Sequence, residues 1–311
     1  MMNSSTDQAT HVSLVGSLPA TSLTICSRGR PKLLLETVES VLQGDEVPSE
    51  IVIVDQSKDR HPQLETMKTN RACEVRYLWD YSVGVSRARN ISIAAAQYDV
   101  LALIDDDMFV APTWFESLIR ALIDAGTHAV VTGQVRPTEA EIPGGFAPST
   151  KLDEVPATYT GRVKADVLFT GNMAMYRAAI NDIGAFDERL GVGARFPAAY
   201  DNDFGFRLLE AGYKIIYVPQ AMVYHRAWRT KRDYPRLRWN YGRGRAAFYA
   251  KHLSLRDRYM LSRMAVDFKS HFSLLLQHMR HERYRVFSDA MYTLGFLSGV
   301  AEWLLTQRRT D

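Results

Sequence analysis

The sequence predicts an α/β fold in which a central, mostly parallel sheet is flanked by helices. Short apolar runs that fit buried strands alternate with segments of helical periodicity over the first 220 residues. One run, residues 100–104, is apolar throughout and ends on three consecutive carboxylates. The chain has 311 residues and is 46% apolar, which is enough for one large domain with an appendage.

The expected elements follow one another as strand and helix. Strands are expected at residues 22–26, 50–55, 74–78, 100–104, 128–133 and 214–218, and helices at 31–42, 63–70, 85–97, 112–125 and 201–211. Pro31 suits the first turn of its helix because its fixed backbone angle is already helical. Gly212 follows the last helix of the series, as is common at a helix end. Parallel pairing is expected because helices separate the strands.

Three regions depart from this alternation. Residues 1–20 are expected to be disordered or loosely attached. Residues 137–164 contain several prolines and glycines and little periodicity, which predicts a long loop. Residues 229–311 are expected to be helical, with a basic stretch up to His281 and an apolar helix from Phe287 to Leu305. We therefore expect a catalytic domain at 21–228 and a basic helical region at 229–311.

Asp105, Asp106 and Asp107 directly follow the apolar run at 100–104. Two unit charges about 4 Å apart repel by roughly 4 kcal/mol at an effective dielectric constant near 20, so three adjacent carboxylates favour a cationic partner. Open α/β sheets bind ligands at the carboxyl ends of their strands, which predicts a site for a divalent metal and phosphate. An acidic turn that caps the following helix remains the alternative.

Basic residues concentrate toward the C-terminus. From residue 221 onward the chain has 18 lysines and arginines against 7 acidic residues, whereas the first 220 residues have 20 against 28. This asymmetry suggests a catalytic body with a basic tail that meets an anionic partner. Two interpretations stay open: an anionic membrane surface, or a helical appendage that packs on the body or forms a homodimer. Nucleic acid is not expected, because no nucleic-acid module is present.

Cys26 and Cys73 lack metal-ligand spacing and fit a reducing compartment. The first residues lack the pattern of a secretory signal peptide, and the 12-residue uncharged run at 290–301 is shorter than a membrane span. A cytoplasmic protein is expected, either free or held at the inner face of the membrane.

Eight motifs occur in order between residues 23 and 225. They are LTICSRGRP, IVIVDQS, SVGVSRARN, LALIDDDMF, FTGNMAMYR, IGAFDERLG, YDNDFGFRLLEAGYKIIYVP and VYH. The ordered set resembles the family 2 glycosyltransferases, which have the GT-A fold. The resemblance implies an inverting, metal-assisted transfer of a sugar from a nucleoside diphosphate, UDP by default, to the hydroxyl of a glycan, lipid-linked or small-molecule acceptor. Pro235 stands where processive members carry the Gln of a Gln-x-x-Arg-Trp motif, so transfer is expected to be non-processive.

The resemblance also implies roles for residues near the donor. Mn²⁺ or Mg²⁺ would be bound by Asp105, Asp107 and His225. The nucleotide would be met by Ser27, Arg28, Arg30, Asp55, Arg89, Asp105 and Asp106, and the sugar or acceptor pocket would include Gly171, Asn172 and Gly193. An interior histidine and an exposed helix arginine remain the alternatives for His225 and Arg89.

In-line displacement at the anomeric carbon needs a base that takes the proton of the acceptor hydroxyl. Asp201 occupies the position that resembles the family's base, and Asp203 is the other acidic candidate. Either residue could instead cap the helix at 201–211. The family's usual Glu-Asp pair is Tyr200-Asp201 here. A nucleotidyltransferase on a similar fold and a non-catalytic sugar- or nucleotide-binding protein therefore remain alternatives.

Overall fold

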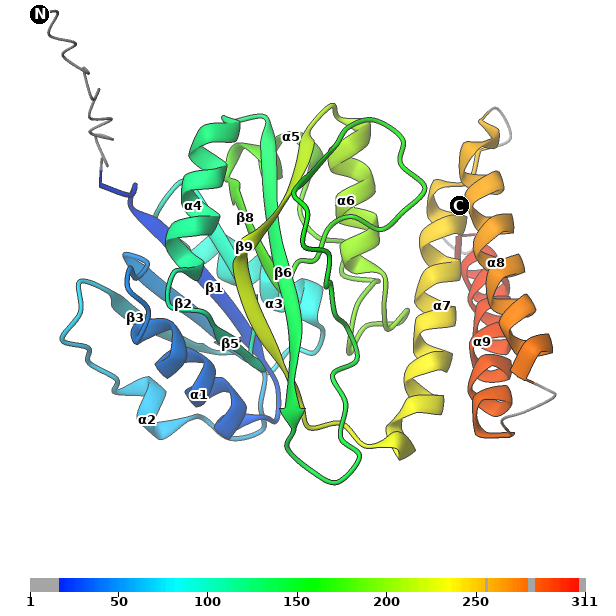
Figure 1. Ribbon diagram of the computed structural model, residues 1–311, viewed down its shortest axis with the longest axis horizontal. Helices are drawn as coiled ribbons and strands as arrows, with labels where there is room; N and C mark the ends of the chain where they lie inside the picture. Colours follow the sequence, from blue (N-terminus) through cyan, green and yellow to red (C-terminus); the bar gives the residue numbers. More distant parts are fainter. Residues whose placement is uncertain (1–16, 255–256, 279–282, 308–311) are drawn as a thin grey trace, which may run out of the picture.

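The structure, a computed structural model, describes residues 17–254, 257–278 and 283–307. Within them, one nine-stranded sheet runs in the order β3-β2-β1-β4-β8-β6-β9-β5, with β7 also paired to β9 (Figure 1). The strands are β1 (Thr21–Ser27), β2 (Glu50–Asp55), β3 (Glu74–Trp79), β4 (Val100–Asp105), β5 (Met108–Val110), β6 (Ala129–Ala140), β7 (Ala157–Tyr159), β8 (Asn172–Tyr176) and β9 (Lys214–Ala227). The helices are α1 (Pro31–Leu42), α2 (Pro62–Glu65), α3 (Val85–Ala95), α4 (Trp114–Ala125), α5 (Ala178–Ile183), α6 (Tyr200–Glu210), η1 (Lys231–Asp233), α7 (Tyr234–His252), α8 (Arg258–His278) and α9 (Arg283–Gln307).

The sheet is parallel in its first half and mixed in its second. β3, β2, β1 and β4 are parallel, as the alternation of strand and helix predicts. Beyond them, β8 is antiparallel to β4 and β6, and β5 and β7 are antiparallel to β9, while β6 and β9 are parallel. The strands that run antiparallel to their neighbours, β5, β7 and β8, have only three to five residues each.

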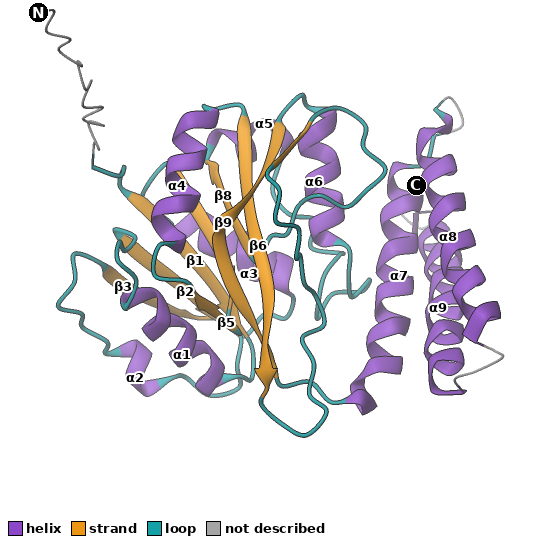
Figure 2. Cartoon of the chain, in the orientation of Figure 1, coloured by secondary structure: helices purple, strands orange, loops and turns teal. Residues whose placement is uncertain are grey.

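Helices cover both faces of the sheet (Figure 2). Alternate side chains of each strand point to opposite faces. Leu23 and Ile25 belong to the core beneath α1 and α4, whereas Leu101 and Leu103 belong to the core beneath α3 and α6. The two cores therefore pack against both faces of the central strands and fix the positions of the strand ends.

All six strands that the sequence predicts are present, and β6 and β9 extend well past their expected ends. The expected helix at 63–70 is only the four-residue α2, because Leu64 and Met67 are the only apolar residues available to pack there. The expected loop at 137–164 contains the end of β6 and the strand β7. Four elements were not expected (β5, β7, β8 and α5), since segments of three to six residues show little periodicity.

The C-terminal region is helical, as predicted, and it lies beyond α6 at one side of the sheet (Figure 1). Its helices α7 and α9 approach closely at glycines. A Cβ atom at Gly242 would lie 2.2 Å from the carbonyl oxygen of Tyr292, and one at Gly295 would lie 2.4 Å from that of Trp239. Only residues without a side chain permit this backbone contact.

The expected apolar helix at 287–305 lies within α9, and it is buried on one side only. Tyr292, Phe296 and Trp303 are buried, whereas Leu297 and Leu304 are about half exposed. Within the described ranges, no helix combines the length and hydropathy that a membrane crossing requires. His281 and residues 1–16 lie outside the described residues.

Asp203 on α6 joins the C-terminal region to the body. Its carboxylate is fully buried and lies 2.9 Å from Arg207, 2.7 Å from Lys251 and 2.7 Å from His252. The last two residues belong to α7, so the ion pairs fasten α7 to α6. Burial opposes ionisation of Asp203, but the hydrogen bond from His252 and the nearby cations hold its pKa below the usual range.

We predict that Asp203→Asn lowers the free energy of unfolding by about 2 kcal/mol, because Arg207 and Lys251, which are partly exposed, lose a buried counter-charge. Urea denaturation followed by circular dichroism measures the change. Glu65→Gln is the control, since it removes an exposed ion pair with Arg60 and should cost under about 1 kcal/mol. Equal stability of the two variants would contradict a structural role for Asp203.

Candidate active site

The carboxyl ends of β1, β2 and β4 meet at one edge of the sheet, where a cavity of about 1380 Å³ opens. The remaining wall comes from the start of α6, from α7 and from residues 148–153. Nine of the predicted site residues line this cavity: Ser27, Arg28, Arg30, Asp105, Asp106, Asp107, Gly193, Asp201 and His225. These residues thus come together in the fold, although they lie up to 198 positions apart along the chain.

Asp107 is the most heavily contacted carboxylate of the cluster. Arg30 donates a hydrogen bond of 2.9 Å to its Oδ2 atom, and the indole Nε1 of Trp228 donates another of 3.1 Å. Nε2 of His225 lies 3.6 Å from its Oδ1 atom. Burial opposes ionisation, but His225 and Arg30 outweigh it and hold the pKa of Asp107 below its usual range. Asp107 therefore stays charged at neutral pH.

Asp106 is completely buried beside it. The Ser27 hydroxyl donates a hydrogen bond of 2.5 Å to one carboxylate oxygen, and Arg30 lies 2.6 Å from the other. Burial raises the pKa of Asp106 to about 7 despite the charge of Arg30. Asp106 is thus a weaker acid than Asp107. The guanidinium of Arg30 contacts both carboxyls.

Asp105 is held by a buried arginine. Nη2 of Arg89 lies 2.6 Å from the Asp105 carboxylate, and Arg89 is only 1% exposed. The exposed-arginine alternative for Arg89 is therefore wrong. The guanidinium carbon also lies 5.5 Å from the ring centre of Tyr200, which stands where the family usually has an acid. Burial raises the pKa of Tyr200, so its hydroxyl stays protonated and uncharged. Asp105 is therefore the group that balances the charge of Arg89.

His225 reaches the cluster through a strand that the sequence did not reveal. β5 pairs with β9 so that Met108 lies opposite His225, and the N–H of Arg226 donates to the carbonyl of Asp107. Nδ1 of His225 lies 2.8 Å from the carbonyl oxygen of Ser149, which leaves Nε2 facing Asp107. Burial lowers the pKa of His225, but Asp107 more than compensates and the pKa is raised overall.

The structure brings together two of the three predicted metal ligands, Asp107 and His225. Asp105 is held by Arg89 instead, and the described part of the chain has no cluster of three His, Cys, Asp or Glu side chains suited to a metal ion. The ligand set Asp105, Asp107 and His225 is therefore not gathered into one group among the described residues, and metal binding by these side chains stays a prediction. One or two side chains that share a cation with substrate phosphates are typical of Mg²⁺ sites, so Asp107 and His225 fit such a cation.

Five predicted site residues lie behind the cavity lining: Asp55, Arg89, Gly171, Asn172 and Asp203. The Asp55 carboxylate accepts hydrogen bonds from the Tyr77 hydroxyl and the backbone N–H of Ser57, at 2.8 and 2.9 Å. Asn172 is fully buried, and its side chain accepts a hydrogen bond from Trp114. The polar atoms of Asp55 and Asn172 have partners within the protein, and the predicted contacts of these residues with nucleotide and sugar stay predictions.

Asp201 lies at the start of α6, where it faces the cavity. It follows Ala199, whose φ of 64° is left-handed and costs energy for a residue with a side chain. Gly244 of α7 packs directly against the preceding residue, Ala198, and supports this turn. Burial and the nearby charge of Asp166 raise the pKa of Asp201 to about 6. Asp201 is therefore a carboxylate with unusual basicity.

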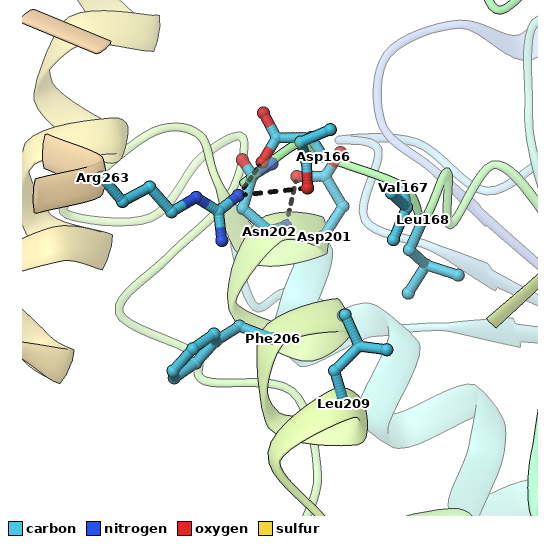
Figure 3. Close-up of a pocket in the computed structure, with 10 residues that line it drawn as sticks. Asp166, Val167, Leu168, Asp201, Asn202, Phe206, Leu209 and Arg263 are labelled. Atoms are coloured by element: carbon cyan, nitrogen blue, oxygen red, sulfur yellow. Dashed lines mark hydrogen bonds and ion pairs between the residues drawn. The ribbon is translucent and has the colours of Figure 1, made fainter. Parts of the chain in front are cut away.

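Asp166 is itself fixed by the C-terminal region. Figure 3 shows Arg263 of α8 pointing at its carboxylate. The two side chains lie 2.6 Å apart, and Arg245 of α7 also pairs with Asp166. A second cavity of only about 10 Å³ lies between this cluster and α6. Sequence reasoning missed Asp166, Trp228 and Ser149, because each acts through a partner far away in the chain.

The comparisons agree with this fold. The central sheet flanked by helices, with a helical C-terminal region, is a GT-A fold. Residues 22–184, just over half of the chain, match the model of Glycosyl transferase family 2, and the chain belongs to that family. Asp201 and His225 lie beyond the matched range.

Two curated relatives are similar over part of the chain. The pre-mycofactocin glycosyltransferase of Mycobacterium tuberculosis is 28% identical over 185 residues, which are 58% of this chain and 38% of that protein. The chain thus spans well under half the length of that relative. The glucosyl-dolichyl phosphate glucuronosyltransferase of Haloferax volcanii is 25% identical over 232 residues, which are 68% of this chain and 71% of that protein.

Solved structures share the fold at low sequence identity. The mannosyltransferase PcManGT of Pyrobaculum calidifontis, in complex with GDP-Man and Mn²⁺, has a TM-score of 0.61 at 15% identity, over 92% of this chain and 88% of that chain. TarS residues 1–349 of S. aureus, in complex with UDP-GlcNAc, has a TM-score of 0.52 at 16% identity, over 90% of this chain and 91% of that chain.

We predict that Gly171→Ala weakens donor binding, because a Cβ atom at this position would lie 2.3 Å from the Asp105 carboxylate and would push it from Arg89. A displacement near 1 Å at a site of this kind can cost on the order of 100-fold in rate, and we expect roughly tenfold weaker nucleotide affinity. Isothermal titration with UDP and Mn²⁺ measures it. Unchanged affinity in a variant with a native circular dichroism spectrum would contradict the positioning of Asp105.

Proposed function

We propose that this chain transfers a sugar from a nucleoside diphosphate donor to an acceptor hydroxyl with inversion at the anomeric carbon. The observation that carries the proposal is that Asp201 and the acidic cluster Asp105–Asp107 line one cavity. A leaving diphosphate near the cluster and a base on α6 are the two groups that in-line displacement needs.

The donor half of the cavity supplies charge and hydrogen bonds from the ends of β1 and β2. Arg28 and Lys58 are exposed cations at its surface, and Arg30 lies deeper against the acidic cluster. Arginine forks bind phosphate oxygens in pairs, which suits them to a diphosphate. A divalent cation held by Asp107 and His225 would stabilise the negative charge of the leaving diphosphate.

Asp201 is the proposed base. A carboxylate with a pKa of about 6 is largely ionised at pH 7, yet it binds a proton more readily than an ordinary aspartate. Asp203 is not suited to the role, because its carboxylate lies behind the lining and is held by Arg207, Lys251 and His252. Asp201 is therefore the carboxylate placed to take the acceptor proton.

The finer details of substrate and location remain part of the proposal. UDP is the expected nucleotide and single-sugar transfer the expected mode. The exposed apolar side chains of α8 and α9 support a peripheral position on an acidic membrane. A second copy of the chain is the alternative surface that would cover them. These side chains are Leu261, Val266, Phe272, Leu276, Phe287, Leu294, Leu297, Leu304 and Leu305.

A donor panel tests the class of reaction. The purified chain is incubated with UDP-, GDP- and dTDP-sugars, with Mn²⁺ and with EDTA, and nucleoside diphosphate release is followed. We expect release from one nucleotide class and at least tenfold less release with EDTA, because the leaving charge is then unneutralised. Equal release with EDTA would contradict metal assistance. Binding of a nucleotide sugar without release in any mixture would favour a non-catalytic protein.

Asp201→Asn should reduce transfer by at least about 100-fold, because it removes the base, while nucleotide affinity stays close to normal. In the wild type, kcat should fall about tenfold per pH unit below pH 6, since protonated Asp201 cannot accept the acceptor proton. Asp124→Asn, on the exposed surface of α4, is the control and should behave as the wild type. A variant that keeps half its activity would remove Asp201 from this role.

A further inference from the structure

The C-terminal region forms one wall of the cavity, and that wall is rich in arginine. Arg229 follows β9, and Arg236, Arg238, Arg243 and Arg245 lie on α7. All five line the same cavity as the acidic cluster, Asp201 and Tyr241. A donor diphosphate at the strand ends, as proposed above, would leave the α7 side of the cavity to the acceptor.

Three of these arginines are already neutralised within the protein. Arg238 lies 3.0 Å from Asp289, and Arg243 pairs with Glu302. Arg245 lies 3.2 Å from Asp267 and also pairs with Asp166. Their charges hold the helices together and are not free for a ligand.

Arg229 and Arg236 differ, because neither forms an ion pair with any carboxylate in the described residues. The Arg229 guanidinium lies 4.8 Å from the ring centre of Trp228, and its Nε atom is buried without a hydrogen-bond partner there. Asp233 lies near both arginines. Its pKa is lowered chiefly by its bonds to Thr230, and both arginines add to the effect. One carboxylate shared by two cations leaves a net positive charge at this point.

Tyr241 relates this positive point to the proposed base. It lines the cavity, and burial raises its pKa, while the charge of Arg229 opposes the rise and that of Asp201 adds to it. Arg229, Tyr241 and Asp201 all line the one cavity, so an acceptor bound in it has both charged groups within the same site.

We propose that the acceptor carries a phosphate group, bound by Arg229 and Arg236 at the junction of β9 and α7. This inference rests on the proposed function, because it assigns the acceptor side of the same cavity. Two guanidinium forks offer more donors than a carboxylate can accept, whereas a phosphate monoester has three terminal oxygens and close to two negative charges. The phosphate could belong to a lipid or to a soluble sugar or polyol.

Calorimetric titration of the full chain, saturated first with UDP and Mn²⁺, tests the inference. Saturation keeps phosphate probes out of the donor site. The probes are glycerol 3-phosphate and dihexanoyl phosphatidic acid, with glycerol as the neutral control. We expect both phosphates to bind and glycerol not to bind. In R229Q/R236Q we expect affinity at least about tenfold lower, because two charge-assisted contacts are lost. Arg236→Gln alone, at an exposed position, should give an intermediate loss.

Arg232→Gln is the matched control, since Arg232 is an exposed arginine of the same connection outside the cavity lining. UDP affinity should be equal in all variants, which also shows that they are folded. Tighter binding of the phosphatidic acid than of glycerol phosphate assigns a lipid source, and equal binding a soluble one. Phosphate binding no stronger than glycerol binding, or equal in R229Q/R236Q and R232Q, overturns the inference. Failure of the wild type to bind UDP would instead contradict the proposed function itself.

Discussion

The repulsion among three consecutive carboxylates at the end of β4 is the constraint on which this site depends. Each is neutralised by a side chain from a different part of the chain: Arg30 from the β1–α1 connection, Arg89 from α3 and His225 from β9. At a separation of about 4 Å, each pair of like charges costs several kcal/mol in a partly buried site. The ion pairs that offset this repulsion therefore hold three segments, distant in sequence, at the end of β4, where the cavity lies.

Local pattern explains which parts of the fold the sequence predicts. The long apolar runs and periodic helices were correct, because a buried strand or an amphipathic helix shows its own pattern. β5 was missed because three residues carry no period, and yet its pairing with β9 is what brings His225 to Asp107. The position of the acidic cluster was predictable, whereas the strand that completes it was not.

The roles of single polar residues follow from partners that the sequence does not reveal. In the sequence, nothing distinguishes Asp55, Asn172 and Asp203 from the polar residues that line the cavity. In the structure, each forms a hydrogen bond or ion pair with a side chain 22 to 58 positions away. Arg89 shows the reverse, since a helical position that looked exposed is buried beneath Asp105. Sequence reasoning gives the chemical types at a site, whereas tertiary packing decides which atoms remain available to a ligand.

The placement of α7 has a consequence for how such an enzyme diversifies. The segment that matches the family ends at residue 184 and includes the acidic cluster. α7 and the β9–α7 junction lie beyond that segment, in the C-terminal region. Asp203 ties that region to the helix that also carries Asp201. Under the proposed function, substitutions on the cavity side of α7 would alter acceptor recognition, whereas the acidic cluster lies within the segment that matches the family.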